Sequence, residues 1–299
     1  MSWPVAGRVV AGGESQLPVR LLTVIPTRNE VLHVARAIES VLPLGPVFVV
    51  DSESEDATVA IAEGCGATVV VHRWEGYAAQ KNWALGNLPL KTEWVLFLDA
   101  DEIITPQLRD EIERSLDDDT TDGLYIPRRY VFLGRVLRHA WWYPDYQLRL
   151  FRLEKGRFED RLVHEHAVVE GRTGFAKAPL IHENLKGIDA FLERHVHYAR
   201  LEAEEILKSE GGMQPEWRGR LTGRWPDRRR ALKVRLWYRL PFRPAIRFLW
   251  LYLVKRGFLD GRQGRVYCQL LAAYEAMIDA ELLERQGTGA GPTGPGKQV

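Results

Sequence analysis

The stretch WVLFLDADE, residues 94–102, joins a run of apolar residues directly to three carboxylates. The apolar run at 95–98 is typical of a parallel strand that is covered on both faces. Carboxylates at the end of such a strand are costly unless they pair with a cation or bind one. Side chains at i and i+2 of an extended chain point the same way, so Asp99 and Asp101 are expected to converge and to offer oxygen ligands to Mg or Mn. Taken alone, the same segment also fits a solvated turn before the next helix.

Composition limits the class of protein. The chain has 299 residues, of which 45% are hydrophobic, enough for one large domain with an appendage or for two small domains. Two cysteines are too few for a disulfide framework and favour a reducing compartment. Residues 1–20 contain no apolar segment of the kind found in a signal peptide. The segment FLWLYLV (248–254) is too short to span a bilayer.

Strand-like and helix-like segments alternate over the first 116 residues. Thr105 and Pro106 fit the N-cap and the first position of the last of these helices. The alternation predicts right-handed crossovers and a mostly parallel sheet. The predicted strands are 20–26, 47–51, 67–72 and 94–99, and the predicted helices are 29–42, 56–66, 76–88 and 105–116.

The pattern changes in the second half of the chain. Alternating segments at 123–134, 146–152 and 157–171 predict strands of a mixed sheet, and helical segments follow at 187–208 and 242–285. A Gly- and Pro-rich tail is expected to be disordered. We therefore predict an N-terminal segment (1–19), a catalytic domain (20–210), a basic, aromatic helical region (211–286) and the tail (287–299).

Polar groups follow each strand of the first half. They are PTRNE, DSESED, HRWEG and DADE, in chain order. In an open parallel sheet ligands bind beyond the carboxyl ends of the strands, so these groups predict a binding site. The sequence has no G-x-G-x-x-G after the first strand and no G-x-x-x-x-G-K-[ST], which argues against a dinucleotide dehydrogenase and a P-loop NTPase.

Several motifs, in this order and spacing, resemble the family 2 glycosyltransferases and most of all the branch of the lipopolysaccharide-core beta-1,4-glucosyltransferases. They are IPTRNE (25–30), VVDSESEDAT (49–58), GYAAQKNWAL (76–85), FLDADE (97–102), YPDYQLRLFR (143–152), VHE (163–165) and, more weakly, RGFLDGRQG (256–264). Glu53 and Glu55 depart from the family pattern at turn positions. The resemblance implies a GT-A fold: an α/β, Rossmann-like, mostly parallel sheet flanked by helices, here with a basic amphipathic helical appendage at the C-terminus.

The resemblance also implies the residues that bind a nucleotide-sugar donor. Glu30 is suited to the ribose hydroxyls and Asp51 to the uracil N–H. The alternatives are a helix cap for Asn29 and Glu30, an Asx turn for Asp51 and a solvated lysine for Lys81. The complete donor set is Pro26, Thr27, Asn29, Glu30, Asp51, Lys81, Asp99, Ala100, Asp101 and Arg149.

The metal ligands and the catalytic base follow from the same resemblance. A divalent cation, Mn or Mg, is expected on Asp101, Asp99 and His164, with a structural role as the alternative for His164. Asp145 is expected to take the proton of the acceptor hydroxyl. The rings before Asp145 are expected to raise its pKa by desolvation and to stack on a sugar. The predicted acceptor contacts are Trp141, Trp142, Tyr143 and Gln147.

Basic residues concentrate in 217–262, which holds fourteen Lys/Arg and two acids. Arg interleaved with aromatic and aliphatic residues favours contact with an anionic membrane surface through 225–262. Packing on the catalytic domain or on a second subunit, or nucleic-acid binding, are the alternatives, and we expect no nucleic acid. The expected location is cytoplasmic, peripheral on the inner face of the membrane.

The sequence as a whole favours a metal-dependent inverting glycosyltransferase. Its expected donor is a UDP-hexose, and its expected acceptor is a cell-envelope glycan, such as lipopolysaccharide core, or a lipid-linked glycan. Two other hypotheses remain: a nucleotidyltransferase of related fold, and a non-catalytic membrane- or nucleic-acid-binding protein with a degenerate transferase domain.

Overall fold

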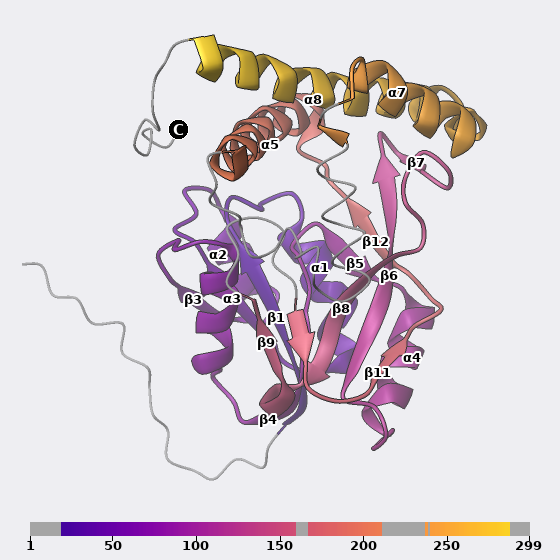
Figure 1. Ribbon diagram of the computed structural model, residues 1–299. Coiled ribbons are helices and arrows are strands. Elements are labelled where there is room, and N and C mark those ends of the chain that lie inside the picture. The colour runs from indigo at the N-terminus through magenta and orange to yellow at the C-terminus, as the bar shows by residue number, and fades with distance from the viewer. Residues whose placement is uncertain (1–18, 160–166, 211–236, 239, 288–299) are drawn as a thin grey trace, which may run out of the picture.

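The computed structural model describes residues 19–159, 167–210, 237–238 and 240–287 (Figure 1). Its centre is a ten-stranded sheet with the order β3-β2-β1-β4-β8-β6-β12-β5, to which β7 and β11 add on β6. The strands are β1 (Val19–Thr27), β2 (Val47–Asp51), β3 (Thr68–Val71), β4 (Thr92–Phe97), β5 (Glu102–Ile104), β6 (Gly123–Phe132), β7 (Arg135–Val136), β8 (Asp145–Arg152), β11 (Thr173–Phe175) and β12 (Leu180–Glu183). A separate ribbon joins β9 (Gly156–Phe158) to β10 (Ala167–Val169).

Seven α-helices accompany the sheet within the described residues. They are α1 (Val34–Val41), α2 (Thr58–Gly64), α3 (Tyr77–Gly86), α4 (Pro106–Leu116), α5 (Gly187–Glu210), α7 (Arg243–Leu249) and α8 (Gly261–Gly287). Short helical turns lie at Leu42–Leu44, Leu153–Lys155, Trp250–Val254 and Gly257–Asp260.

The first half of the sheet is parallel, as predicted. β2 and β4 both pair parallel with β1, and β3 pairs parallel with β2. Consecutive strand residues alternate between two buried faces, so Leu21 packs with α1 and α4, whereas Leu22 packs with α3 and β9. β8 runs antiparallel to β4 and β6, which makes the second half mixed, also as predicted. The predicted fold class, an α/β sheet flanked by helices with a helical C-terminal region, is confirmed.

The predicted helix at 29–42 is wrong at its start. α1 begins at Val34, because residues 28–33 form a turn in which Asn29 adopts a left-handed conformation with φ of 53°. Tertiary contacts hold this turn: the Asn29 amide donates to Ser54 Oγ at 2.7 Å, and its side-chain oxygen accepts from the Glu55 amide at 2.8 Å. The Thr105 cap is confirmed, since its hydroxyl accepts from the Leu108 amide.

Other predicted elements differ at their edges. Of the predicted strand 157–171, residues 157–158 belong to β9 and residues 167–169 form β10, and residues 160–166 lie outside the described part of the chain. The segments 1–18 and 288–299, predicted as an N-terminal segment and a disordered tail, also lie outside it. The short strands β5, β11 and β12 were not predicted. Among the described residues no helix is both long and apolar enough to cross a bilayer.

The helices α5, α7 and α8 form a layer across one end of the sheet, at the top of Figure 1. Tyr267 of α8 is buried against Tyr130 and Trp141, so this layer shares a core with the sheet. Packing on the predicted catalytic domain, one alternative for the C-terminal region, is therefore present for α8. The domain boundary at residue 210 stays a prediction.

A buried carboxylate fastens this layer. Asp260, in the RGFLDGRQG segment, accepts three backbone N–H bonds, from Arg138, His139 and Ala140, at 2.8 to 3.0 Å. Burial raises the pKa of Asp260, but these three donors outweigh burial and lower it. The start of α8 packs closely on the backbone of the preceding turn, and glycine at 264 makes this possible. A Cβ on Gly264 would lie 2.3 Å from the Gly257 carbonyl oxygen.

We predict that Asp260→Asn destabilises the fold by about 2 kcal/mol, because an amide cannot accept all of the bonds that the carboxylate accepts. Urea unfolding of Asp260→Asn measures the loss, and Asp119→Asn, at a carboxylate that is 99% exposed, is the control. Because the folded pKa is lowered from 3.8, the contribution is complete above about pH 4 and is lost as the pH falls through the folded pKa. Equal stability of the two variants at pH 7 would contradict this role.

Candidate active site

The carboxylates of the opening stretch lie at the carboxyl end of β4, but not on an extended chain. β4 ends at Phe97, and Ala100 and Asp101 lie in a turn. The Glu102 amide donates to the Asp99 carbonyl oxygen at 2.9 Å, and the Asp99 amide donates to Glu102 Oε2 at 3.0 Å, which closes the turn. The geometry expected for Asp99 and Asp101, two carboxylates on one face of a strand, is therefore wrong, and each contacts a different set of groups.

Asp99 and Glu102 share a buried guanidinium. Arg149, which is 7% exposed, donates from Nη2 to Asp99 Oδ2 and to Glu102 Oε1, both at 2.5 Å. Lys81 Nζ lies 3.7 Å from the other oxygen of Asp99. Burial alone raises the pKa of Asp99, but the charges of Arg149 and Lys81 outweigh it and hold that pKa well below its usual range. Asp99 is thus an ionised carboxylate that two cations neutralise.

Glu102 is a buried acid of the site that was absent from the predicted set. It is fully buried, and burial raises its pKa to about 7 although Arg149 and Arg128 oppose the shift. Arg128 Nη1 lies 3.9 Å from Glu102 Oε1. The third carboxylate of the quoted stretch was the available signal, but its partners lie in strands far along the chain.

Arg128 links Glu102 to the predicted base. Its Nη2 and Nε donate to Asp145 Oδ2 at 2.7 and 3.0 Å, and Gln147 Nε2 donates to Asp145 Oδ1 at 3.1 Å. Arg128 and Asp145 are paired across β6 and β8. Because β8 runs antiparallel to β4, its first residue, Asp145, lies at the same edge of the sheet as the end of β4.

The rings before Asp145 face the C-terminal helices. Trp141 packs on Tyr130 and Tyr267, and Trp142 packs on Trp250 with ring centroids 4.7 Å apart. Tyr143 lies under the Arg129 guanidinium. The nearest polar contacts of Asp145 are Arg128 and Gln147, so its carboxylate is paired with a cation.

Asp101 lies beside a histidine that the sequence did not indicate. His182 Nδ1 is 3.4 Å from Asp101 Oδ1, and the Asn184 amide donates to Asp101 Oδ2 at 3.4 Å. His182 pairs with Glu102 on β5 and with Tyr130 on β6, and its ring stacks on that of Tyr130 at 5.1 Å. Burial lowers the pKa of His182 more than the Asp101 charge raises it, so the imidazole is neutral.

The Asp101–His182 pair fits a divalent cation. His182 Nδ1 is buried and has no hydrogen-bond partner, and a neutral imidazole nitrogen beside a carboxylate is a ligand set that Mn accepts. Nucleotide sites commonly hold such ions with one or two protein ligands and substrate phosphates. Within the described residues no three acidic, histidine or cysteine side chains converge on one point. His164, the predicted third ligand, lies outside those residues.

Asp51 and its neighbours form the other side of the site. The buried Asp51 carboxylate accepts from Thr27 Oγ1 at 2.8 Å and from the Ser54 amide and hydroxyl at 2.7 and 2.5 Å. A carboxylate offers about four lone-pair positions, so one acceptor position remains. Pro26 precedes Thr27 in β1, at the same edge of the sheet.

Glu30 connects the first loop to the loop after β12. Its Oε1 accepts from Lys186 Nζ and its Oε2 from His33 Nδ1, both at 2.7 Å. The Leu185 amide donates to His33 Nε2, which fixes the proton of the neutral ring on Nδ1. Asn184, which contacts Asp101, lies in the same loop. The predicted donor residues Asn29 and Glu30 thus also brace the site.

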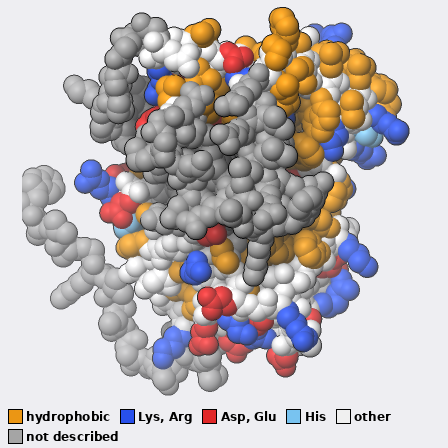
Figure 2. All heavy atoms as spheres, viewed as in Figure 1, with side chains coloured by type: hydrophobic (Ala, Val, Ile, Leu, Met, Phe, Trp, Pro, Cys, Tyr) orange, Lys and Arg blue, Asp and Glu red, His pale blue; other side chains and the backbone are white. Residues whose placement is uncertain are grey.

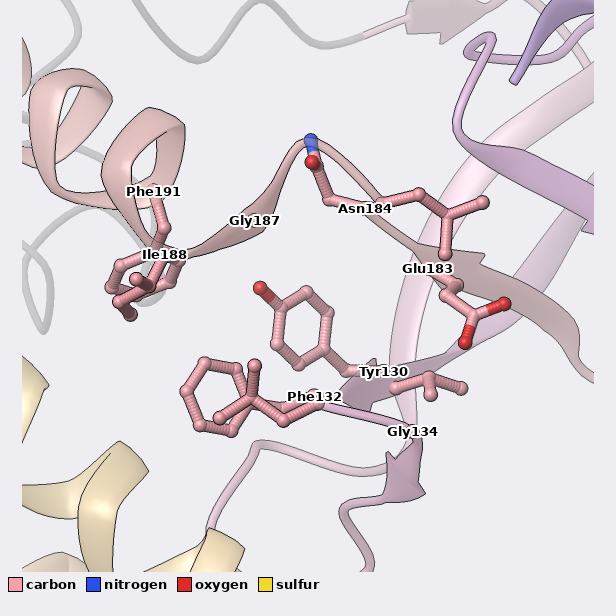
Figure 3. A pocket seen from close by; sticks show the side chains of 11 residues that line it. Tyr130, Phe132, Gly134, Glu183, Asn184, Gly187, Ile188 and Phe191 are labelled. Atoms are coloured by element: carbon pink, nitrogen blue, oxygen red, sulfur yellow. The ribbon is translucent and has the colours of Figure 1, made fainter. Parts of the chain in front are cut away.

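A pocket of about 190 Å³ opens beside the Asp101–His182 pair. Tyr130 projects from β6 between Phe132 and the connection that carries Asn184, and Ile188 and Phe191 of α5 form the opposite wall (Figure 3). Its walls are mainly aromatic and aliphatic. Such a surface suits the face of a sugar ring or an apolar group better than a phosphate.

Residues 23–167 match the family model described as glycosyl transferase family 2. The fold and this match define a class: the chain carries a family 2 glycosyltransferase domain, as its motifs predicted. The match favours this class over a nucleotidyltransferase.

Relatives extend the likeness. An uncharacterized glycosyltransferase of Rickettsia bellii is 47% identical over 98 residues, which are 32% of this chain and 33% of that protein. The chain therefore spans about a third of the length of the Rickettsia relatives that it matches. The lipopolysaccharide core biosynthesis glycosyltransferase LpsC of Rhizobium meliloti is 29% identical over 82% of this chain and 87% of its own length. The mannosyltransferase PcManGT of Pyrobaculum calidifontis, solved with GDP-Man and Mn2+, is 15% identical, with coverage of 95% and 90% and a TM-score of 0.46.

We predict that Arg149→Met destabilises the fold by about 3 kcal/mol, because it leaves the fully buried Glu102 and the partly exposed Asp99 without their shared cation. Adding Glu102→Gln removes one of these charges and should recover part of the loss. Thermal and urea unfolding of the single and double variants measure the coupling, with the exposed Arg265→Met as the control. Additive losses would show that the two side chains act independently.

Proposed function

We propose that the protein is a metal-dependent inverting glycosyltransferase that moves a hexose from a UDP-sugar to an acceptor hydroxyl. The observation that carries this function is a continuous set of ionic contacts from Lys81 and Asp99 through Arg149, Glu102 and Arg128 to Asp145, with the Asp101–His182 pair beside it. It lies at the carboxyl end of the parallel strands, where open α/β sheets bind ligands. The family 2 match supports the same function.

The donor would lie between two groups of residues. Asp51, with one acceptor position left, would bind the N–H of the base, and Pro26, Thr27, Asn29 and Glu30 would line the nucleoside side. Asp101 and His182 would hold the divalent cation, with Asp99 in support, and the turn at Ala100 would lie on the diphosphate side. When bound, that cation supplies charge neutralisation for the departing diphosphate. Lys81 and Arg149 add positive charge beside Asp99.

Asp145 would take the proton from the acceptor hydroxyl as the acceptor oxygen bonds to the anomeric carbon and the bond to the diphosphate breaks. Arg128 occupies Asp145 Oδ2 with two N–H groups, and Gln147 occupies one position of Oδ1, so the other Oδ1 position would be left for the acceptor hydroxyl. This arrangement orients the base before the acceptor arrives.

The acceptor is proposed to be a cell-envelope glycan. Supporting this class, LpsC, whose name places it in lipopolysaccharide core biosynthesis, aligns with 82% of the chain. The predicted contacts Trp141, Trp142 and Tyr143 precede Asp145 in the chain, and the Trp141 ring lies under the Arg128 guanidinium that pairs with Asp145. The pocket adds Tyr130 and Phe191. A cytoplasmic location, peripheral on the inner face of the membrane, belongs to the same function.

We predict that a UDP-hexose raises the melting temperature only when Mn or Mg is present. Asp101→Asn and His182→Gln should each lower donor affinity by roughly 10- to 100-fold, the cost of disturbing even the groups that orient a metal ligand. Thermal shift titrations with a panel of UDP-, GDP- and dTDP-sugars measure the effect. The exposed Asp119→Asn and His197→Gln are the matched controls. Unchanged donor affinity in Asp101→Asn would overturn the proposed metal site.

We predict that Asp145→Asn lowers kcat by about 10²- to 10⁴-fold while the donor-induced thermal shift stays the same, because a general base acts on the acceptor. UDP release in the presence of a panel of deacylated lipopolysaccharide oligosaccharides measures the rate. Asp119→Asn again serves as the control. A variant that loses donor binding together with rate would assign Asp145 to donor binding instead.

A further inference from the structure

A patch of exposed apolar side chains lies on the C-terminal layer. Leu249, Leu253, Val254, Phe258 and Leu259 are 51, 54, 68, 45 and 50% exposed, respectively, within eleven consecutive positions. We call this surface, with the cations between and beside these residues, the 249–262 patch. Figure 2 shows hydrophobic side chains gathered on this part of the molecule, over α7, with Lys and Arg at their margin. Contiguous exposed apolar surface of this kind marks an interaction site.

The local structure fixes which side chains face outward. The inner side chain Leu251 is 1% exposed and packs in the core shared with Tyr267, whereas Leu253 and Val254 follow on the outside of the same helical turn. The chain then reverses at Arg256, which adopts a left-handed conformation, and the Phe258 ring lies 6.0 Å from that of Tyr252. The outer residues are therefore held on a rigid support and are not the end of a frayed helix.

The charge of the patch selects the kind of partner. Between residues 240 and 262 the one acid is Asp260, which is buried and engaged by backbone N–H groups. The cations Arg256 and Arg262 are exposed, and Lys255 Nζ lies 4.3 Å from the Trp142 ring centroid and 5.3 Å from that of Trp250. Aliphatic side chains, indole rings and cations without exposed acids match the interface of an anionic bilayer.

We propose that the 249–262 patch docks the protein on the surface of an anionic phospholipid bilayer, with Leu253 and Val254 entering the acyl boundary and Arg256 and Arg262 contacting the headgroups. Trp142, three residues before Asp145, packs on Trp250 behind the patch. Docking therefore sets the loop of the base close to the membrane, where the sugar of a lipid-linked acceptor would lie. Only this last consequence rests on the proposed function.

Co-sedimentation of the full chain with vesicles tests the docking. One set contains phosphatidylcholine alone, and a second contains about 30% phosphatidylglycerol, comparable to an anionic leaflet. The wild type should bind the anionic vesicles about tenfold more tightly than the neutral ones. Leu253→Ser with Val254→Ser should weaken that binding about tenfold or more. Arg256→Gln with Arg262→Gln should remove most of the preference for anionic lipid.

Matched controls separate the patch from general surface hydrophobicity. Val71 and Leu283 are 57 and 70% exposed elsewhere, so Val71→Ser with Leu283→Ser removes the same residue types and should leave vesicle binding unchanged. Equal vesicle binding by the Leu253→Ser, Val254→Ser variant and by the Val71→Ser, Leu283→Ser control would overturn the docking surface. Light scattering tests a second outcome. A wild type of twice the monomer mass would also overturn the docking surface if Leu253→Ser with Val254→Ser made the protein monomeric and left vesicle binding unchanged. The patch would then join two copies of the chain.

The vesicle assay needs no donor. A protein that sediments with anionic vesicles but shows no metal-dependent shift with any nucleotide sugar would keep the docking surface and lose the proposed function. The reverse result, a donor-induced shift without vesicle binding, would keep the function and lose the docking surface. In both patch variants the donor-induced thermal shift should equal that of the wild type, which also shows that they fold.

Discussion

One buried guanidinium nitrogen, Nη2 of Arg149, joins two carboxylates and holds the site together. It is the shared cation of Asp99 and Glu102, and through Glu102 it is connected to Arg128 and Asp145. The fully buried Glu102, with the partly exposed Asp99 beside it, needs such a cationic partner. The turn after β4 and the start of β5 hold the two acids of this pairing, with Asp101 between them. An apolar core of the same volume would be at least as stable, so the ionic arrangement indicates a site and not only a fold.

Sheet register does the remaining positioning. Glu102, His182 and Tyr130 lie in one row across β5, β12 and β6, and Arg128 faces Asp145 across β6 and β8. Because cross-strand neighbours share a face, five side chains from four strands reach the same edge without any loop having to place them. The antiparallel entry of β8 is what brings Asp145 to the carboxyl end of a strand that runs the other way.

Local sequence patterns were enough for the parallel half of the sheet. Its strands are short apolar runs, its helices have periodic spacing and Thr105 caps α4. Local sequence patterns did not predict the elements whose structure depends on contacts with residues far along the chain. Asn29 lies outside the helix because Ser54 and Glu55 bind it. The strand β12 has only four residues and is defined by its pairing with β6 and β5. His182 was missed for that reason, since nothing near it in the chain indicates that it will lie beside Asp101.

The C-terminal layer contacts the segment 138–145 at two places. On its inner side Tyr267 packs on Tyr130 and Trp141, which flank His182 and Asp145, and Asp260 binds the backbone at 138–140. On its outer side Trp250 packs against Trp142. A packed core transmits displacement because it has little free volume. Contacts that fix the Trp250 turn from outside would therefore also restrain the segment 138–145, so the 249–262 patch would bear on where Asp145, the proposed base, stands relative to its proposed acceptor.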